Sequence, residues 1–282
     1  MTLAASLRRE IVQRQLVQLP LRWRARLALR AGRVQPGVTV VTVNWNSEPF
    51  LRVCLGAVKA FSPASTGIMV VDNHSTDGSL EYLRTTRDVR VVRLPANIGH
   101  EVALDIGFLL ARTEYVISLD VDAFPISERW IETLLEPLRN GADVAGAHVR
   151  GGFVHPCCLA MRLRDFVTRD HSFVARRAGR WATDASDITA PAWDTGYKIS
   201  LREPRRFLID RTHVHGPGDI GSVFGDVVYH NFYSVRFDNP KQQFSPDELA
   251  ADVSRAAALD AWDEATARLL PRGLLESGGG AE

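Results

Sequence analysis

The sequence predicts an α/β protein with a mostly parallel central sheet, helices on both faces, and further helical segments at both ends of the chain. Short β-branched runs alternate with helical stretches between residues 37 and 140, and turn-forming residues separate the two kinds of segment. Strands that alternate with helices pair in parallel, because each helix carries the chain back to the edge of the sheet where the next strand starts.

The elements follow one another from residue 38 onward. Strands are predicted at residues 38–43, 68–71, 89–94 and 115–119, and helices at 47–61, through Leu80 and Leu83, at 99–112, and from Ser127 along an apolar stripe. Beyond Asp143 the pattern loosens. Ser245-Pro246-Asp247-Glu248 then forms a capping box with proline at the first helical position, which predicts a last helix with an apolar stripe from Leu249 to Leu269.

Composition narrows the functional classes. The 282 residues carry 34 basic and 33 acidic side chains, so a net charge of +1 gives no general attraction to nucleic acid. The three cysteines form no disulfide framework, which favours a reducing cytoplasm. No signal peptide and no apolar run of membrane-spanning length is apparent in this sequence. We expect a cytoplasmic protein, at most peripheral at the inner membrane surface.

Positive charge is concentrated in the N-terminal segment. Residues 1–33 hold eight arginines against the single acid Glu10, and Leu3, Leu7 and Ile11 recur at helical spacing. Gly32 and Pro36 end this segment. A basic helix of this kind either contacts an anionic membrane surface or packs on the protein core or on a partner, and the sequence leaves both open.

Asp120 and Asp122 follow the buried run 115–119. In an extended segment side chains alternate, so the two carboxylates would point the same way. Two hard oxygen donors at the end of a buried strand suit Mg²⁺ or Mn²⁺, and such a metal commonly neutralises phosphate oxygens.

Two other polar segments fall at the same predicted edge of the sheet. Asn44-Trp45-Asn46 follows the first strand and Asp72 follows the second. Ligands of open parallel sheets bind beyond the carboxyl ends of the strands. Trp45 could stack on a base and Asp72 could accept an N–H from its edge, although an Asx turn explains Asp72 equally well. A nucleotide diphosphate along this edge would meet all three groups.

These residues resemble the GT-A nucleotide-diphospho-sugar glycosyltransferases of family 2, which have a Rossmann-like fold. The resemblance is carried by Val43-Asn44-Trp45-Asn46-Ser47, Val71-Asp72-Asn73-His74-Ser75-Thr76-Asp77-Gly78, Asn97-Ile98-Gly99 and Leu119-Asp120-Val121-Asp122. It implies a nucleotide-binding set of Val43, Trp45, Asp72, Asn97 and Asp120, and a metal held by Asp120 and Asp122. Where the family often has Arg-Asn, this chain has Leu104-Asp105, so one diphosphate contact is missing.

The resemblance also implies three segments. Residues 1–36 would form the basic helical segment and 241–282 the C-terminal helix with a flexible tail. Between them lies the GT-A domain at 37–240. Its first half, 37–140, would bind the donor, a nucleotide-diphospho-sugar with UDP-sugars favoured. Its second half, 141–240, would bind a carbohydrate, glycolipid or small-molecule acceptor.

Inverting transfer needs a general base for the acceptor hydroxyl. In this family the base is an acid in the second half, which points to Asp194, with Asp184 and Asp187 as weaker choices; Asp194 also suits a helix N-cap. His230 is predicted as a third metal ligand or phosphate donor, with a structural histidine as the alternative.

Five other residues of the second half are also interpreted. His213 and His215 form either a zinc pair or part of a mobile loop over the site. His155 is given an acceptor role, and Cys157 and Cys158 are expected to be buried packing residues.

Two other functions remain to be weighed. A catalytically silent sugar-nucleotide-binding or scaffold protein would share the fold, and the missing Arg-Asn pair keeps that reading open. A sugar-1-phosphate nucleotidylyltransferase is disfavoured, because residues 44–50 contain no glycine where a glycine-rich loop would be needed.

Overall fold

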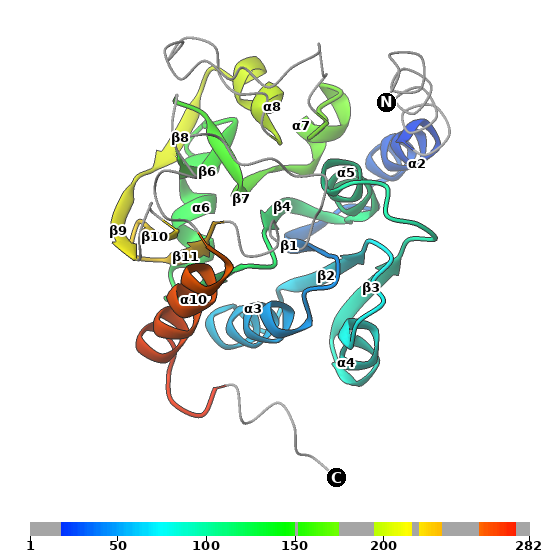
Figure 1. The fold of residues 1–282 in the computed structure, drawn as a ribbon. Helices are drawn as coiled ribbons and strands as arrows, with labels where there is room; N and C mark the ends of the chain where they lie inside the picture. The colour runs from blue at the N-terminus through cyan, green and yellow to red at the C-terminus, as the bar shows by residue number, and fades with distance from the viewer. Residues whose placement is uncertain (1–17, 150–151, 175–194, 216–219, 233–253, 275–282) are drawn as a thin grey trace, which may run out of the picture.

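The computed structural model describes residues 18–149, 152–174, 195–215, 220–232 and 254–274. They form two β-sheets with helices packed around them (Figure 1). The strands are β1 (Gln35–Asn44), β2 (Gly67–Asp72), β3 (Val89–Arg93), β4 (Thr113–Leu119), β5 (Ala123–Pro125), β6 (Val144–His148), β7 (Val154–Arg162), β8 (Arg206–Ile209), β9 (Arg211–His215), β10 (Gly221–Phe224) and β11 (Val228–Asn231). The helices are α2 (Leu19–Arg30), α3 (Glu48–Phe61), α4 (Ser79–Thr85), α5 (His100–Leu110), α6 (Trp130–Arg139), α7 (Leu163–Thr168), α8 (Tyr197–Arg202) and α10 (Arg255–Leu269).

The larger sheet confirms the predicted α/β fold. Its seven strands run in the order β3-β2-β1-β4-β7-β6-β8, and only β7 is antiparallel to its neighbours. The carboxyl ends of β1, β2 and β4 therefore meet at one edge, where Asn44 pairs in register with Asp72. This edge collects the polar segments that the sequence singles out.

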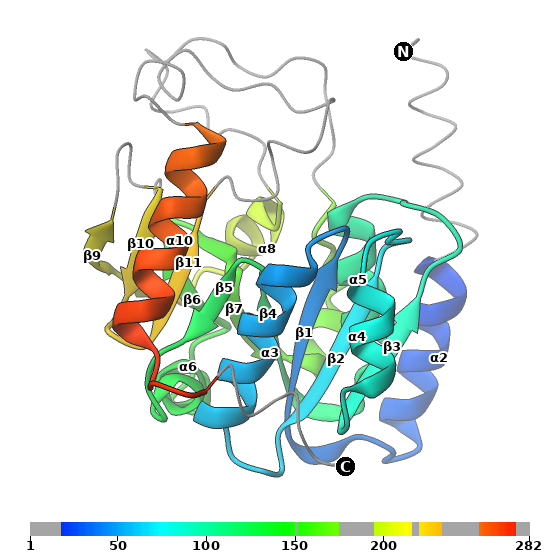
Figure 2. The same ribbon diagram turned by 60° about the horizontal axis from the view of Figure 1, so that its bottom comes forward.

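Helices cover both faces of this sheet (Figure 2). The strands are buried on both sides, as in β1, where Val38 and Val40 join one core cluster and Val41 and Val43 the other. The first cluster contains side chains of α3, α4, α6 and α10, and the second those of α2, α5, α7 and α8. The alternation of side chains along each strand thus divides the apolar residues between two helical layers.

The smaller sheet is antiparallel, in the order β5-β11-β10-β9. β5 follows β4 after three residues, and β11 pairs with it so that His230 lies opposite Ala123. Helix α10 packs on β10 and β11. This sheet brings a late segment of the chain to the end of β4.

Several local expectations need correction. Asp120 and Asp122 do not lie in an extended strand but in a turn closed by the Ala123 N–H and the Asp120 carbonyl, 3.0 Å apart. His213 and His215 are on strand β9, not in a loop, and in the residues described they form no metal cluster.

The last helix also differs from the prediction. Ser254 is extended (φ −117°, ψ 162°) and caps α10, with its hydroxyl accepting a hydrogen bond from the Ala257 N–H at 3.1 Å. The helix therefore cannot run continuously from Leu249 to Leu269. The predicted capping box at Ser245 lies outside the described residues, as does residue range 1–17 of the basic segment.

None of the helices in the described ranges is both long and apolar enough to cross a bilayer.

Candidate functional site

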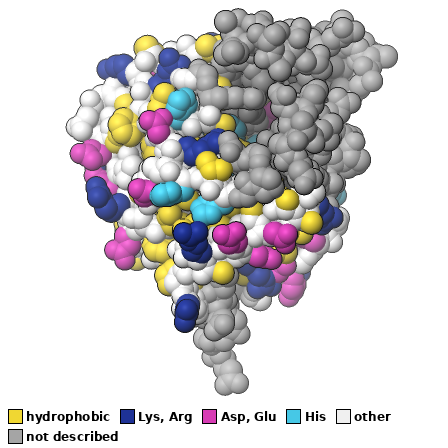
Figure 3. Space-filling view, turned by 60° about the vertical axis from the view of Figure 1, so that its left-hand side comes forward, with side chains coloured by type: hydrophobic (Ala, Val, Ile, Leu, Met, Phe, Trp, Pro, Cys, Tyr) yellow, Lys and Arg dark blue, Asp and Glu magenta, His cyan; other side chains and the backbone are white. Residues whose placement is uncertain are grey.

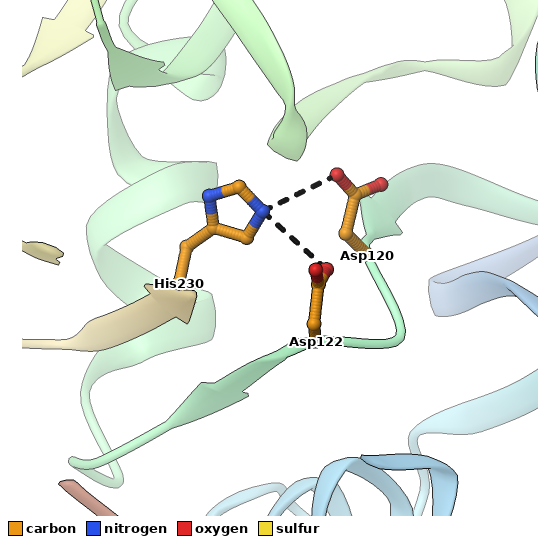
Figure 4. Close-up of side chains that lie close together, drawn as sticks. All are labelled: Asp120, Asp122 and His230. Carbon is orange, nitrogen blue, oxygen red and sulfur yellow. Dashed lines mark ion pairs between the residues drawn. The ribbon is translucent and has the colours of Figure 1, made fainter. Parts of the chain in front are cut away.

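The site is built where the two sheets meet. Asp120 follows β4, Asp122 precedes β5, and His230 belongs to β11, the strand that pairs with β5 (Figure 4). His230 Nε2 lies 3.5 Å from Asp120 Oδ2 and 3.4 Å from Asp122 Oδ1. The three side chains offer ligand atoms that all lie within 4.8 Å of one another. We call these three residues the acidic triad.

Burial and charge shape the acidic triad. Burial alone would raise the pKa of Asp120, but the hydrogen bonds and positive charge of His100 and His230 hold it well below its usual range. Burial would likewise lower the pKa of His230, yet Cys157, Asp120 and Asp122 raise it well above its usual value. The site is therefore a tight arrangement of two carboxylates around one imidazole, which binds a metal only after losing its proton.

This donor set fits a hard divalent cation. Two carboxylates and one imidazole, converging from different elements, match the oxygen and nitrogen ligands that Mn²⁺ and Mg²⁺ accept. Asp120 Oδ1 is buried, and its ion-pair partner among the described residues is His100 Nε2, at 3.4 Å. His230 is thus brought to the position that the sequence predicted for a third ligand.

His100 is a neighbour of the site that the sequence did not reveal. It is the first residue of α5, and its Nε2 lies 3.4 Å from Asp120 Oδ1. A second histidine therefore faces the other carboxylate oxygen of Asp120, since His230 faces Oδ2. The signal in the sequence was its position directly after Asn-Ile-Gly, at the same edge of the sheet.

Asn44, Asp72 and Ser75 form a buried network beside the acidic triad. Asn44 Nδ2 donates to Asp72 Oδ1 at 3.1 Å and to Ser75 Oγ at 2.9 Å, and the Ser75 N–H donates to Asp72 Oδ2 at 3.1 Å. Asp72 is fully buried. These contacts hold the local turn, which is one of the two roles that the sequence leaves open for Asp72. Both oxygens of Asp72 are engaged in this network and its side chain has no exposed surface, so recognition of a base by Asp72 stays a prediction.

The other predicted nucleotide-binding residues lie along the same edge. Val43 is buried in β1, and Trp45 follows this strand half-buried, its carbonyl accepting the Ser47 hydroxyl at 2.8 Å. Asn97 Oδ1 accepts hydrogen bonds from Asn73 Nδ2 at 3.0 Å and from the Gly99 N–H at 3.1 Å. Asn97 therefore shapes the turn that leads into α5.

Leu104 and Asp105 do not replace the missing diphosphate contact. Both side chains are fully buried, Leu104 in the core cluster on the α5 side of the sheet. Asp105 accepts hydrogen bonds from Gln18 Nε2 at 2.6 Å and from the Phe173 N–H at 2.8 Å. Residue 105 therefore ties α5 to α2 and to the segment after α7.

The second half of the predicted site is described in part. Asp184, Asp187 and Asp194 lie outside the described residues. The His155 ring lies 6.1 Å from the His230 ring, so β7 does bring His155 to the edge of the acidic triad. Cys157 and Cys158 are buried and free, as expected.

The histidines of β9 lie elsewhere. They belong to the far strand of the small sheet, and the face on which β9 lies shows histidine, acidic, basic and apolar side chains intermixed (Figure 3). His213 Nε2 is 3.5 Å from Asp226 Oδ1, and both side chains are exposed.

Parts of the chain are similar in sequence to known proteins. The sequence profile of glycosyl transferase family 2 matches residues 39–162. An undecaprenyl-phosphate 4-deoxy-4-formamido-L-arabinose transferase from Aeromonas hydrophila is 27% identical over 181 residues, which are 61% of this chain and 50% of the relative. The chain thus matches about half of the length of this curated relative.

Two solved structures share the fold. The mannosyltransferase PcManGT from Pyrobaculum calidifontis, in complex with GDP-Man and Mn²⁺, aligns over 99% of this chain and 88% of its own, with a TM-score of 0.51 and 17% identity. S. aureus TarS 1–349 aligns over 84% of this chain and 74% of its own, with a TM-score of 0.50 and 15% identity.

The sheet order, the polar edge and these matches define a glycosyltransferase of the GT-A fold. Within that class, residues 39–162 match the profile of family 2. The resemblance noted from the sequence is thereby confirmed.

Proposed function

We propose that this chain transfers a sugar from a nucleotide-diphospho-sugar to an acceptor hydroxyl with inversion at the anomeric carbon. The observation that carries the proposal is the convergence of Asp120, Asp122 and His230 next to the Asn44–Asp72 network. A nucleotide lying along this edge would place its base near Asp72 and Trp45 and its diphosphate near the acidic triad. UDP-sugars are the favoured donors, and Val43 and Asn97 complete the nucleotide-binding edge.

Asp120, Asp122 and His230 would hold Mg²⁺ or Mn²⁺. Such an ion neutralises the diphosphate and stabilises the departing nucleoside diphosphate. His100 keeps Asp120 in place from the other side, with 3.4 Å between Nε2 and Oδ1. The buried surroundings of the acidic triad strengthen these electrostatic interactions relative to water.

Asp194 is the proposed general base. It lies outside the described residues, but the chain next to it is placed: the Gly196 N–H donates to the Phe173 carbonyl at 3.1 Å. A Cβ built on Gly196 would lie 3.6 Å from Cδ of Pro156, the residue between His155 and Cys157. The segment that contains Asp194 therefore ends beside the strand that borders the acidic triad, which supports this assignment.

A lipid phosphate is the second candidate acceptor. The name of the Aeromonas relative, an undecaprenyl-phosphate transferase, favours it. A phosphate monoester is already ionised near neutral pH and needs no base to accept its proton. Product analysis with a polyprenyl phosphate and with sugar acceptors, using the same donor, distinguishes the two acceptor classes. We place the reaction in the cytoplasm, where the three free cysteines would stay reduced.

The direct test is Asp122→Asn, which removes one charge without changing the size of the side chain. Outer-shell partners of a metal ligand are already worth about 10- to 100-fold in affinity, so loss of a ligand charge should weaken Mn²⁺-dependent UDP or GDP binding at least about 100-fold. Calorimetry with and without Mn²⁺ or EDTA measures this loss, and a donor-turnover assay separates an enzyme from a silent binding protein.

Asp226→Asn is the matched control. This aspartate is 69% exposed, lies in the turn before β11, and contacts only His213 among the ion pairs described. Its variant should keep metal-dependent binding. Unchanged nucleotide binding in Asp122→Asn would remove the metal site from the proposal, and binding without turnover in the native chain would favour the silent reading.

A further inference from the structure

Helix α2 has one buried face and one exposed face. Its inner face packs on α5 and α7, with Ala25 and Ala28 buried. Arg22 is 6% exposed, contacts Asp170 Oδ1 at 3.0 Å through Nε and donates to the His171 carbonyl at 2.6 Å. The helix is thus fixed to the core by its inner side, which confirms the packing interpretation of the basic segment for these residues.

The outer face carries an apolar ridge. Leu19, Trp23 and Leu27 are 57%, 64% and 41% exposed, and they follow one another at intervals of four residues, so they lie along one side of the helix. Three large apolar side chains exposed in a row are costly in water. A helix that only covers the core usually has polar residues on its outer face. The exposed apolar ridge of α2 therefore indicates that this face binds a partner.

The charged side chains that α2 itself places around this ridge are all basic. Arg26 borders the ridge on one side and Arg24 on the other, and Arg30 and Arg33 follow at its end; all four are exposed. Of these four arginines, Arg26 alone has an acidic partner among the described residues, Asp170 at 3.7 Å. In the printed sequence no aspartate or glutamate occurs from residue 11 to residue 47.

The positive field extends beyond the helix. The pKa of Arg112 is lowered, by its partial burial first and then by the positive charges of Arg90 and Arg24. The face around β9, by contrast, shows acidic and basic side chains intermixed (Figure 3). The α2 side therefore differs from an ordinary solvated surface by having both unshielded arginines and exposed apolar side chains.

We propose that the outer face of α2 is a docking surface for an anionic lipid bilayer. Trp23 would lie at the level of the headgroups, where the ring of tryptophan is favoured, with Leu19 and Leu27 reaching the acyl boundary. Arg24, Arg30 and Arg33 would contact lipid phosphates, each arginine contributing attraction that salt screens. Binding is reversible and salt-dependent, because a ridge of three residues is too short for permanent insertion.

The proposal goes beyond the proposed reaction and is tested without donor, acceptor or metal. The full chain is sedimented with vesicles of phosphatidylcholine, with and without phosphatidylglycerol, at low and high salt. We expect binding to the anionic vesicles only, and its loss at high salt. Failure of this test leaves the nucleotide-binding result for Asp122→Asn untouched, so the two proposals fail separately.

Two variants identify the surface. Leu19→Ser/Trp23→Ser/Leu27→Ser should weaken binding about tenfold or more, and Arg24→Gln/Arg30→Gln/Arg33→Gln should weaken it at least about tenfold with a shallower salt dependence. The matched control is Leu201→Ser/Arg206→Gln, since Leu201 is 60% exposed on α8 and Arg206 is exposed on β8. All substituted side chains are exposed, so thermal unfolding should match the native chain.

Brominated phosphatidylcholine in anionic vesicles tests directly whether Trp23 enters the bilayer, because bromine quenches tryptophan fluorescence. This quenching should fall in Trp23→Phe, a variant that keeps the apolar ridge and so should retain binding. Equal binding of the native chain and the triple serine variant would overturn the proposal. A second outcome would also overturn it: the native chain does not bind vesicles, sediments as a dimer without them, and loses the dimer in the triple serine variant. That outcome would assign the ridge to a second copy of the chain.

Discussion

Asp105 shows how one residue can take a different role at a position that a family often uses for binding. It is fully buried, and the side chains of Gln18 and Ser172 and the Phe173 N–H all donate to it. Burial raises its pKa to about 7, although the hydrogen bonds from Ser172 and Phe173 and the charge of Arg22 act in the opposite direction. An acid with this pKa makes the fold sensitive to pH.

The sign of this sensitivity follows from linkage. Because the folded pKa of Asp105, about 7, lies above the ordinary value of 3.8, the folded state holds the proton more tightly than the unfolded state. The stabilisation is therefore complete below about pH 4 and is lost as pH rises toward 7. Asp105→Asn should lack this loss, so its stability relative to the native chain should rise by on the order of a few kcal/mol between pH 4 and 8.

Urea unfolding of the two proteins across this pH range measures the effect. Asn can still accept the Phe173 N–H, and its amide can donate to the Ser172 hydroxyl, so the variant should fold. Asp226→Asn, with an exposed side chain, should show a constant difference from the native chain. A constant difference for Asp105→Asn as well would mean that Asp105 stays ionised in the folded protein.

At the same scale, the sequence predicted the chemistry of the site better than its geometry. Asp120 and Asp122 were named because of residue type and position after an apolar run, His230 was added through the resemblance to a family, and the structure brings the three together. His100 was missed, because no spacing in the sequence shows that the start of α5 reaches Asp120. The turn at Asp120 was missed too, since alternation in a strand was the simpler expectation.

Helix α5 approaches the sheet so closely that it has no room for a side chain at Gly107. A Cβ there would lie 2.3 Å from Val41 Cγ1 of β1 and 3.2 Å from Val71 Cγ2 of β2. Val41 is buried and β-branched, so it has little freedom to move away. This close packing sets the position of α5, and with it that of His100 at its first turn.

Gly107→Ala should therefore destabilise the protein, although alanine is the better helix former. The gain in helix propensity is about 1 kcal/mol, whereas overpacking a rigid core costs about 1–3 kcal/mol and a 2.3 Å contact lies at its severe end. We expect a net loss of about 1 kcal/mol or more by urea unfolding.

Gly78→Ala is the control for this substitution. Its Cβ would meet Glu48 Cγ at 3.5 Å, an ordinary contact with a side chain that can move, and the residue has φ −67°. Its stability should stay close to that of the native chain. A Gly107→Ala variant as stable as the Gly78→Ala variant would show that β1 yields to the added methyl group.

Elements in the first half of the chain were predicted within a few residues, because β-branched runs and helical stripes there are separated by clear turns. The small sheet was not predicted. Its pairing of β5 with β11 joins residues about a hundred positions apart, and each strand is only three or four residues long. Local periodicity carries no information on such pairing, so the position of His230 could be proposed only through the resemblance to a family.

For the whole molecule, helix α10 of the C-terminal segment packs into the core. Trp262 of α10 is 4% exposed, and its ring lies 4.8 Å from Phe50 of α3, 5.2 Å from Phe124 of β5 and 6.2 Å from Tyr229 of β11. One side chain of α10 thus joins helix α3 to β5 and to β11, the strand that carries His230.

Trp262→Ala should accordingly cost about 3–5 kcal/mol of unfolding free energy, the usual range for removal of a fully packed aromatic side chain. Trp23→Ala removes the same side chain from a position that is 64% exposed, so its cost should be within about 0.5 kcal/mol. Because Tyr229 precedes His230, loosening α10 should also weaken Mn²⁺-dependent nucleotide binding, whereas Trp23→Ala should not. Urea unfolding and calorimetry on the two variants measure both effects, and equal stability of the two would mean that α10 does not dock on the small sheet in solution.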